Sequence, residues 1–171
     1  MLRTLRTQAG LCALGFLLSI PAMAQAPAAA APAPAPAVVY DAELAAKLGG
    51  NDNGMKRYVL VVLKTGPNKI TDPDERKKMF QGHMDNIGRM AAEKQLVVAG
   101  PLDGVDGWRG MYIFNTPDIA TAKGWVATDP VIVKGEMVAE YHTLFGSAGL
   151  MAVTDIHNRI TKPAAGALKK N

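Results

Sequence analysis

Two hydrophobic patterns alternate along the chain between residues 55 and 146. Short runs rich in β-branched and aromatic residues predict strands, which lie at 57–64, 96–99, 109–115 and 136–145. Apolar residues spaced three and four positions apart predict helices, which lie at 73–93 and from the Thr116-Pro117-Asp118 segment to about residue 127. The predicted order of elements is therefore βαββαβ.

Capping residues support these helices. Asp72 is a good N-cap, Pro73 suits the first helical position, and Glu75 completes a capping box three residues after the cap. The Asp129-Pro130 pair repeats this signal and predicts a further turn over 129–134. The apolar stripe of the long helix is expected to face the sheet, and it contains a histidine. The stripe consists of Met79, Phe80, His83, Ile87, Met90 and Ala91.

The order of elements predicts an α+β domain of the ferredoxin-like type, with a four-stranded antiparallel sheet and two helices on one face. Strands 58–63 and 111–114 are apolar on both faces, so the face without helices also needs cover. We expect a homodimer that packs sheet against sheet. In a monomer, the helices outside the βαββαβ region would have to cover that face. The expectation rests on Val59, Val61, Met111 and Ile113.

The first 24 residues have the pattern of a cleavable signal peptide. Arg3 and Arg6 form a basic start, residues 11–20 are almost entirely apolar, and Ala22-Met23-Ala24 offers small residues for cleavage after Ala24. The apolar run is shorter than the about 20 residues that a membrane-spanning helix needs, so a permanent anchor is the weaker interpretation. We therefore expect a periplasmic or secreted protein with no membrane contact after cleavage.

The rest of the chain divides into four segments. Residues 25–39 are mostly Ala and Pro, which predicts a disordered spacer. Residues 40–54 contain a short helix at 41–48 and a connection. The main domain spans 55–146, and residues 147–171 form an amphipathic C-terminal helix and a tail. The apolar side of that helix consists of Leu150, Val153, Ile156 and Ile160.

Composition and charge argue against several classes of function. The formal net charge is +4, and loss of Arg3 and Arg6 with the signal peptide would leave +2. Only 6% of residues are aromatic and no block of like charges occurs, so nucleic-acid binding is not expected. Cys12 is the single cysteine and would leave with the signal peptide, so neither disulfides nor thiol catalysis are expected.

The candidate chemistry rests on polar residues in apolar surroundings, because the sequence lacks the strong catalytic motifs. His83 lies on the sheet-facing stripe, where an imidazole suits proton transfer but can equally be a core histidine bound to a backbone carbonyl. Asp129 is its candidate partner, although an N-cap role alone explains an Asp before a Pro. A metal site of His83, Asp85 and His142 is conceivable without a recognised spacing, and we predict no metal and no cofactor.

Several short segments resemble the YCII-related family over about residues 55–145. They are YVLVVLK at 58–64, Glu75-Arg76, Gly82-His83-Met84, LVVAGPL at 96–102 and ATDPVIVKG at 127–135. The resemblance implies a ferredoxin-like fold of the dimeric α/β-barrel type. It also implies an active site in which the family's helix histidine corresponds to His83 and its Asp-Pro aspartate to Asp129. Arg76 is then a neighbouring substrate-binding residue, and the reaction is not settled.

Together these expectations give a hypothesis of an exported enzyme that acts on a small, unidentified organic molecule. His83, oriented by Asp129, would move a proton, which suits isomerases, lyases and hydrolases alike. The alternative is a non-catalytic module of the dimeric ferredoxin-like type that binds a small ligand or a partner protein. In that case His83 and Asp129 serve packing and capping, and the fold alone does not decide between the two.

Overall fold

The computed structural model describes residues 39–162. The predicted signal peptide, nearly all of the predicted spacer and residues 163–171 lie outside this part, so cleavage, export and the spacer stay predictions. Within the described part, every helix is too short or too polar to cross a membrane.

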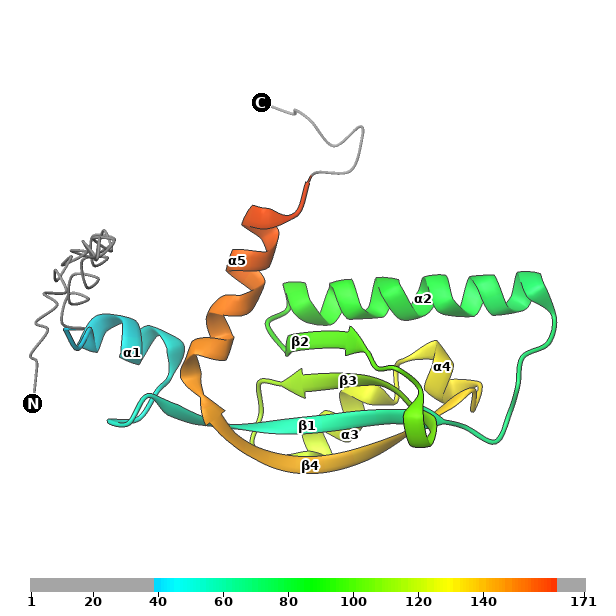
Figure 1. Cartoon of the computed structure of the whole chain (residues 1–171), viewed down its shortest axis with the longest axis horizontal. Coiled ribbons are helices and arrows are strands. Elements are labelled where there is room, and N and C mark those ends of the chain that lie inside the picture. The colour runs from blue at the N-terminus through cyan, green and yellow to red at the C-terminus, as the bar shows by residue number, and fades with distance from the viewer. Residues whose placement is uncertain (1–38, 163–171) are drawn as a thin grey trace, which may run out of the picture. The chain divides into compact units, whose positions relative to one another are not determined.

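The described residues form an α+β domain with one antiparallel sheet of four strands in the order β2-β3-β1-β4 (Figure 1). Its core elements are β1 (Met55–Thr65), α2 (Pro73–Ala92), β2 (Leu96–Pro101), β3 (Trp108–Phe114), α3 (Ile119–Val126), α4 (Pro130–Val133) and β4 (Met137–Ser147). Further helices are α1 (Ala42–Leu48), α5 (Val153–Ile160) and the 3₁₀ turns η1 (Val105–Gly107) and η2 (Ala148–Ala152). The predicted βαββαβ order and ferredoxin-like arrangement are confirmed.

One helix start differs from the sequence-based expectation. The cap of α3 is Asp118, whose carboxylate accepts hydrogen bonds from the backbone N–H groups of Ala120 and Thr121 at 3.2 and 2.8 Å. Thr116 instead accepts a bond from the N–H of Asp118, in a turn that precedes the helix. An aspartate at this position is as good a cap as a threonine, so the sequence signal was correct in kind but two residues too early.

The helices cover one face of the sheet with the main core. Val59, Val61 and Leu63 of β1 pack there with side chains of β3 and with α2, α3 and α4. This corrects the expectation that Val59 and Val61 lie on the open face. Strand residues alternate between faces, and the register pairs Val61 with Tyr112, so Met111 and Ile113 lie on the opposite face.

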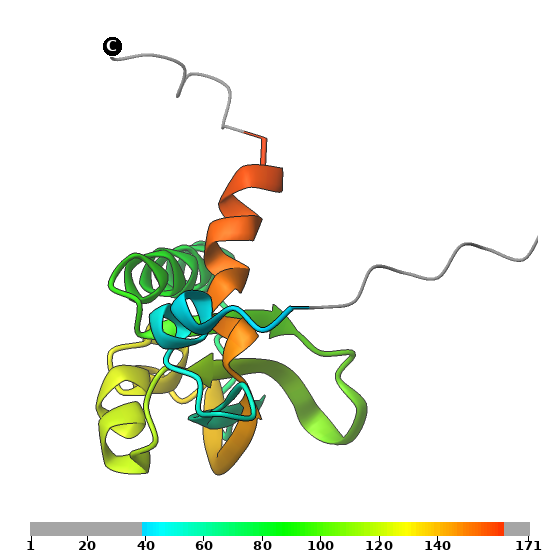
Figure 2. The same ribbon diagram turned by 90° about the vertical axis from the view of Figure 1, so that its left-hand side faces the viewer.

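A second, smaller cluster lies on the opposite face and centres on Tyr58, Val97 and Ile113. Leu150 and Met151 of η2 pack against it. In Figure 2, α2 (green) and the α3–α4 segment (yellow-green) lie on one side of the sheet, while α5 (orange) rises from one end. The C-terminal segment therefore covers part of the face that was expected to be open.

A glycine lets α2 approach α4 closely. A Cβ atom added at Gly82 would lie 3.1 Å from Cγ of Pro130, the first residue of α4. This is closer than a relaxed carbon–carbon contact of about 3.5–4.0 Å. Because His83 follows Gly82 and Asp129 precedes Pro130, the contact sets the spacing between the two candidate site residues.

We predict that Gly82→Ala and Gly88→Ala have different effects, although both lie inside α2. Alanine is favoured over glycine in a helix by about 1 kcal/mol, and a Cβ at Gly88 meets no atom within 4 Å. Gly88→Ala should therefore raise the free energy of unfolding by about 0.5–1 kcal/mol. Gly82→Ala should not raise the free energy of unfolding, because steric strain between the new Cβ and Pro130 would offset the gain in helix propensity. Urea unfolding of both variants checks this, and equal stabilisation would show that the α2–α4 contact is not tight.

Candidate functional site

Asp129 is a carboxylate with no solvent exposure, and three donors satisfy it. As the N-cap of α4, its Oδ1 accepts a bond from the N–H of Val131 at 3.1 Å. Its Oδ2 accepts a bond from the Tyr112 hydroxyl at 2.8 Å, and His83 Nδ1 lies 2.9 Å from the same oxygen. The capping and partner roles that the sequence left as alternatives therefore occur together in one side chain.

His83 comes from the middle of α2, on the stripe that faces the sheet. Its Nδ1 lies between the two carboxylate oxygens of Asp129, at 3.0 Å from Oδ1 and 2.9 Å from Oδ2. An ionised carboxylate only accepts hydrogen bonds, so Nδ1 must carry a proton and donate it. In the neutral ring the lone pair is then on Nε2, which has no hydrogen-bond partner among residues 39–162.

Tyr112 is the third member of the cluster and was missed by the sequence analysis. It lies on β3 opposite Val61, and its hydroxyl is 3.4 Å from His83 Nδ1 as well as bonded to Asp129. Burial, and then the charge and hydrogen bond of Asp129, raise the pKa of Tyr112 far above its usual value. Tyr112 therefore stays a neutral donor. A buried tyrosine usually needs a partner for its hydroxyl, and this was the one available signal.

A cavity of about 570 Å³ lies between α2, β2 and β3, and His83 forms part of its wall. Its volume lies within the range of small-molecule sites, about 300–1,000 Å³. The His83 side chain is 12% exposed, so the ring is held by its buried partner and still borders open space. The rest of the wall is mostly apolar, with Leu63, Phe80, Ile87 and Met137 among its residues.

Arg76, the predicted substrate-binding residue, forms an ion pair with the buried Glu136 and stacks on the Phe80 ring with a centroid distance of 4.9 Å. Glu136 also accepts a bond from the N–H of Ile70 at 2.8 Å. This backbone bond, followed by Arg76 and the charge of Arg109, holds the pKa of Glu136 below its usual value. Arg76 thus fastens the start of α2 to the start of β4, and its substrate role stays a prediction.

The conceivable metal ligands His83, Asp85 and His142 do not come together. Asp85 accepts a bond from Gln81, and His142 Nε2 lies 2.9 Å from Glu140. Across residues 39–162, no three His, Cys, Asp or Glu side chains are grouped closely enough to hold a metal ion.

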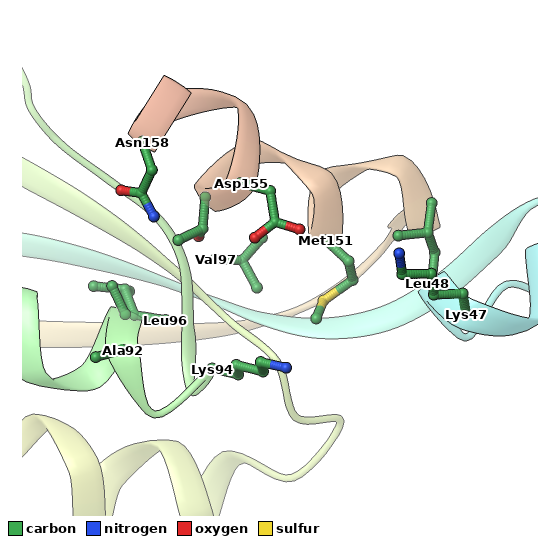
Figure 3. Close-up of a pocket in the computed structure, with 11 residues that line it drawn as sticks. Lys47, Leu48, Ala92, Lys94, Leu96, Val97, Met151, Asp155 and Asn158 are labelled. Carbon is green, nitrogen blue, oxygen red and sulfur yellow. The ribbon is translucent and has the colours of Figure 1, made fainter. Parts of the chain in front are cut away.

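A second cavity, of about 320 Å³, lies between α1, the start of β2 and α5 (Figure 3). Leu96, Val97 and Met151 line it together with the charged side chains of Lys94 and Asp155. His83 of the first cavity is paired with a buried carboxylate, Asp129. Among residues 39–162, no titratable side chain of the second cavity has a buried charged partner of this kind. The first cavity is therefore the candidate functional site.

Comparison with known families finds a match over the sheet domain. The sequence model of the YCII-related domain matches residues 57–144, which run from the first strand of the sheet to the last. No curated protein matches the chain.

We predict that Glu136→Gln destabilises the protein in a pH-dependent way. The folded state lowers the pKa of Glu136, so its charge stabilises the fold above the unfolded pKa of about 4.3, and this contribution is lost as pH falls through the folded value. At pH 7 the free energy of unfolding of the variant should be lower by about 1–3 kcal/mol, because the Gln amide nitrogen is a donor and would face the Arg76 guanidinium, which is also a donor.

Urea unfolding at pH 7 and at pH 3 checks this, and the difference between wild type and variant should shrink at pH 3. Glu75→Gln is the matched control, since Glu75 pairs with Lys134 at the exposed surface and such pairs contribute about 0–1 kcal/mol. A loss that is the same at both pH values would contradict the role of the Glu136 charge.

Proposed function

The chain belongs to the YCII-related domain family, and from this premise we propose that it is an enzyme that uses His83 as a general acid–base on a small organic molecule. The substrate would occupy the cavity of about 570 Å³ beside α2. The observation that carries the proposal is the contact between the His83 ring and Asp129, a carboxylate with no solvent exposure, at the edge of this cavity.

The hydrogen-bond pattern defines the protonation states that such an enzyme needs. Tyr112 and the Val131 N–H donate to Asp129, so its carboxylate oxygens act as acceptors in this cluster. Ionised Asp129 accepts the Nδ1 proton of His83 and leaves Nε2 as the base. When Nε2 takes a proton from the substrate, the imidazolium charge lies beside the buried carboxylate, which stabilises it. Positioned proton transfer of this kind contributes about 10²–10⁴-fold to a rate.

Removal of a proton from an atom beside an electron-withdrawing group fits this arrangement. The bonding electrons stay on the substrate, and Nε2 returns the proton to another atom in an isomerisation or to the leaving group in an elimination. Phe80, Ile87 and other apolar side chains would exclude water from the imidazolium while the intermediate exists. A non-catalytic binding module would need the cavity but not the fixed His83 tautomer.

We also propose a homodimer, with its contact on the sheet face opposite α2. Support comes from the apolar side chains on this face that η2 and α5 leave only partly buried, such as Leu60 and Met111. Val138 at the same face of β4 is 45% exposed. A second copy would remove this surface from water.

We predict that Asp129→Asn reverses the His83 tautomer. The Asn amide nitrogen is a donor, so Nδ1 would become the acceptor and the proton would move to Nε2, where a base is needed. Long-range ¹H–¹⁵N NMR distinguishes the two tautomers: Nε2 should be unprotonated in wild type and protonated in the variant. Proton exchange from small carbonyl compounds into D₂O, followed by ¹H NMR, should fall about 10²-fold or more.

The control is Asp72→Asn, because Asp72 also caps a helix that begins with proline and lies away from His83. Asn caps nearly as well as Asp, so this variant should keep wild-type stability, tautomer and exchange rate. Asp129→Asn should lower the free energy of unfolding by about 1–3 kcal/mol, since the Asn amide nitrogen is a donor and would face the donors that now bind the Asp129 carboxylate. A wild-type His83 already protonated at Nε2, or an unchanged exchange rate in the variant, would contradict the catalytic assignment.

Sedimentation velocity at micromolar concentration checks the homodimer. We expect a dimer that Val138→Glu converts to a monomer with little change in the helix-side core, because Val138 is exposed on the opposite face. A monomeric wild-type protein would mean that η2 and α5 provide all the cover this face needs.

A further inference from the structure

The cavity beside His83 contains one formally charged side chain, Arg109, in otherwise apolar or neutral surroundings. Arg109 is half-buried, and among residues 39–162 it forms no ion pair within 4 Å. A guanidinium cannot lose its charge in a protein, so a partly dehydrated arginine without a counter-charge is unfavourable. The cavity thus provides a cation that is available to a ligand.

A β-bulge places Arg109 at this position. The pairing of β1 with β3 runs from Leu63 opposite Gly110 to Lys64 opposite Trp108, so Arg109 is an extra residue without a partner on β1. Bulges of this kind redirect a side chain and are common beside active sites. The charge of Arg109 reaches Glu136, whose side chain bonds to Arg76 at the start of α2. Arg109 also lines the same cavity as His83 and Phe80 of α2, so it lies on the helix side of the sheet.

The nearby charges are already balanced without Arg109. Arg76 compensates the buried Glu136 directly, and Asp129 is compensated by its donors and by His83. Arg109 forms no ion pair with Glu136 within 4 Å, and its charge is the last of the causes that lower the pKa of Glu136. An anionic group in the cavity would be the counter-charge that Arg109 lacks, in a setting of low dielectric where the attraction is strong.

We propose that the cavity binds a small carboxylic acid with an apolar body, and that Arg109 holds the carboxylate while the apolar part lies against Phe80 and Ile87. The proposal rests on the proposed function and names its substrate class. Arginine matches a carboxylate with two parallel hydrogen bonds, so it fixes orientation as well as charge. A substrate held at Arg109 presents its body to His83 Nε2, so Arg109 is the specificity-determining residue.

Calorimetric titration with matched probes tests this. Phenylacetate should bind wild type about tenfold or more tightly than phenylacetamide, which has the same shape and no charge. Acetate and inorganic phosphate, which have no apolar body, should bind at least tenfold more weakly than phenylacetate. Arg109→Gln should abolish the preference for phenylacetate over the amide, and Arg109→Lys should restore part of it, because the charge returns without the paired geometry.

Arg159→Gln is the matched control, since Arg159 lies on α5 and is exposed, and it should leave the preference unchanged. His83→Ala should keep the preference and lose only proton exchange, which separates this proposal from the proposed function. Equal binding of the two probes by wild type, or a preference that persists in both Arg109 variants, would overturn the proposal. If Arg109→Gln does not fold, as judged by circular dichroism, the Arg109→Lys result decides alone.

Discussion

The site depends on one constraint: a carboxylate with no solvent exposure needs donors from the protein. Asp129 receives them from three elements, through the first turn of α4, the hydroxyl of Tyr112 on β3 and the ring of His83 on α2. Removing one donor would leave a buried charge only partly satisfied, at a cost of about 1–3 kcal/mol or more. The requirement therefore fixes helix, strand and turn in one relative position and also fixes the histidine tautomer.

Two further contacts hold α2 where this cluster needs it. Arg76 ties the first turn of the helix to the buried Glu136 at the start of β4. In the middle of the helix, Gly82 allows the backbone to lie close to Pro130. Arg76 also stacks on Phe80, which lines the cavity, so these contacts hold α2 beside the cavity without forming its wall.

The cavity combines a histidine whose Nδ1 faces Asp129 with a cation and an apolar wall. His83 and Arg109 belong to elements far apart in the sequence, and the bulge in β3 places Arg109 at the same cavity. A carboxylate ligand held at Arg109 would place its apolar body beside His83. Binding and proton transfer would then support each other, since both depend on the same small set of charges in an apolar setting.

Local sequence patterns predicted the order of elements and two residues that meet in the candidate site. Period-two and period-3.6 patterns of apolar residues, together with the Asp-Pro caps, predicted the βαββαβ order. A polar residue within an apolar stripe drew attention to His83, and Asp129 was its predicted partner. The two side chains are in contact in the structure. The face that each strand residue occupies could not be predicted in this way, because it depends on the register of β1 against β3, which places Val61 on the helix side and Met111 on the other. Only the structure revealed Tyr112, Glu136 and Arg109, since their roles come from pairing between distant segments and from a bulge, and neither leaves a local pattern in the chain.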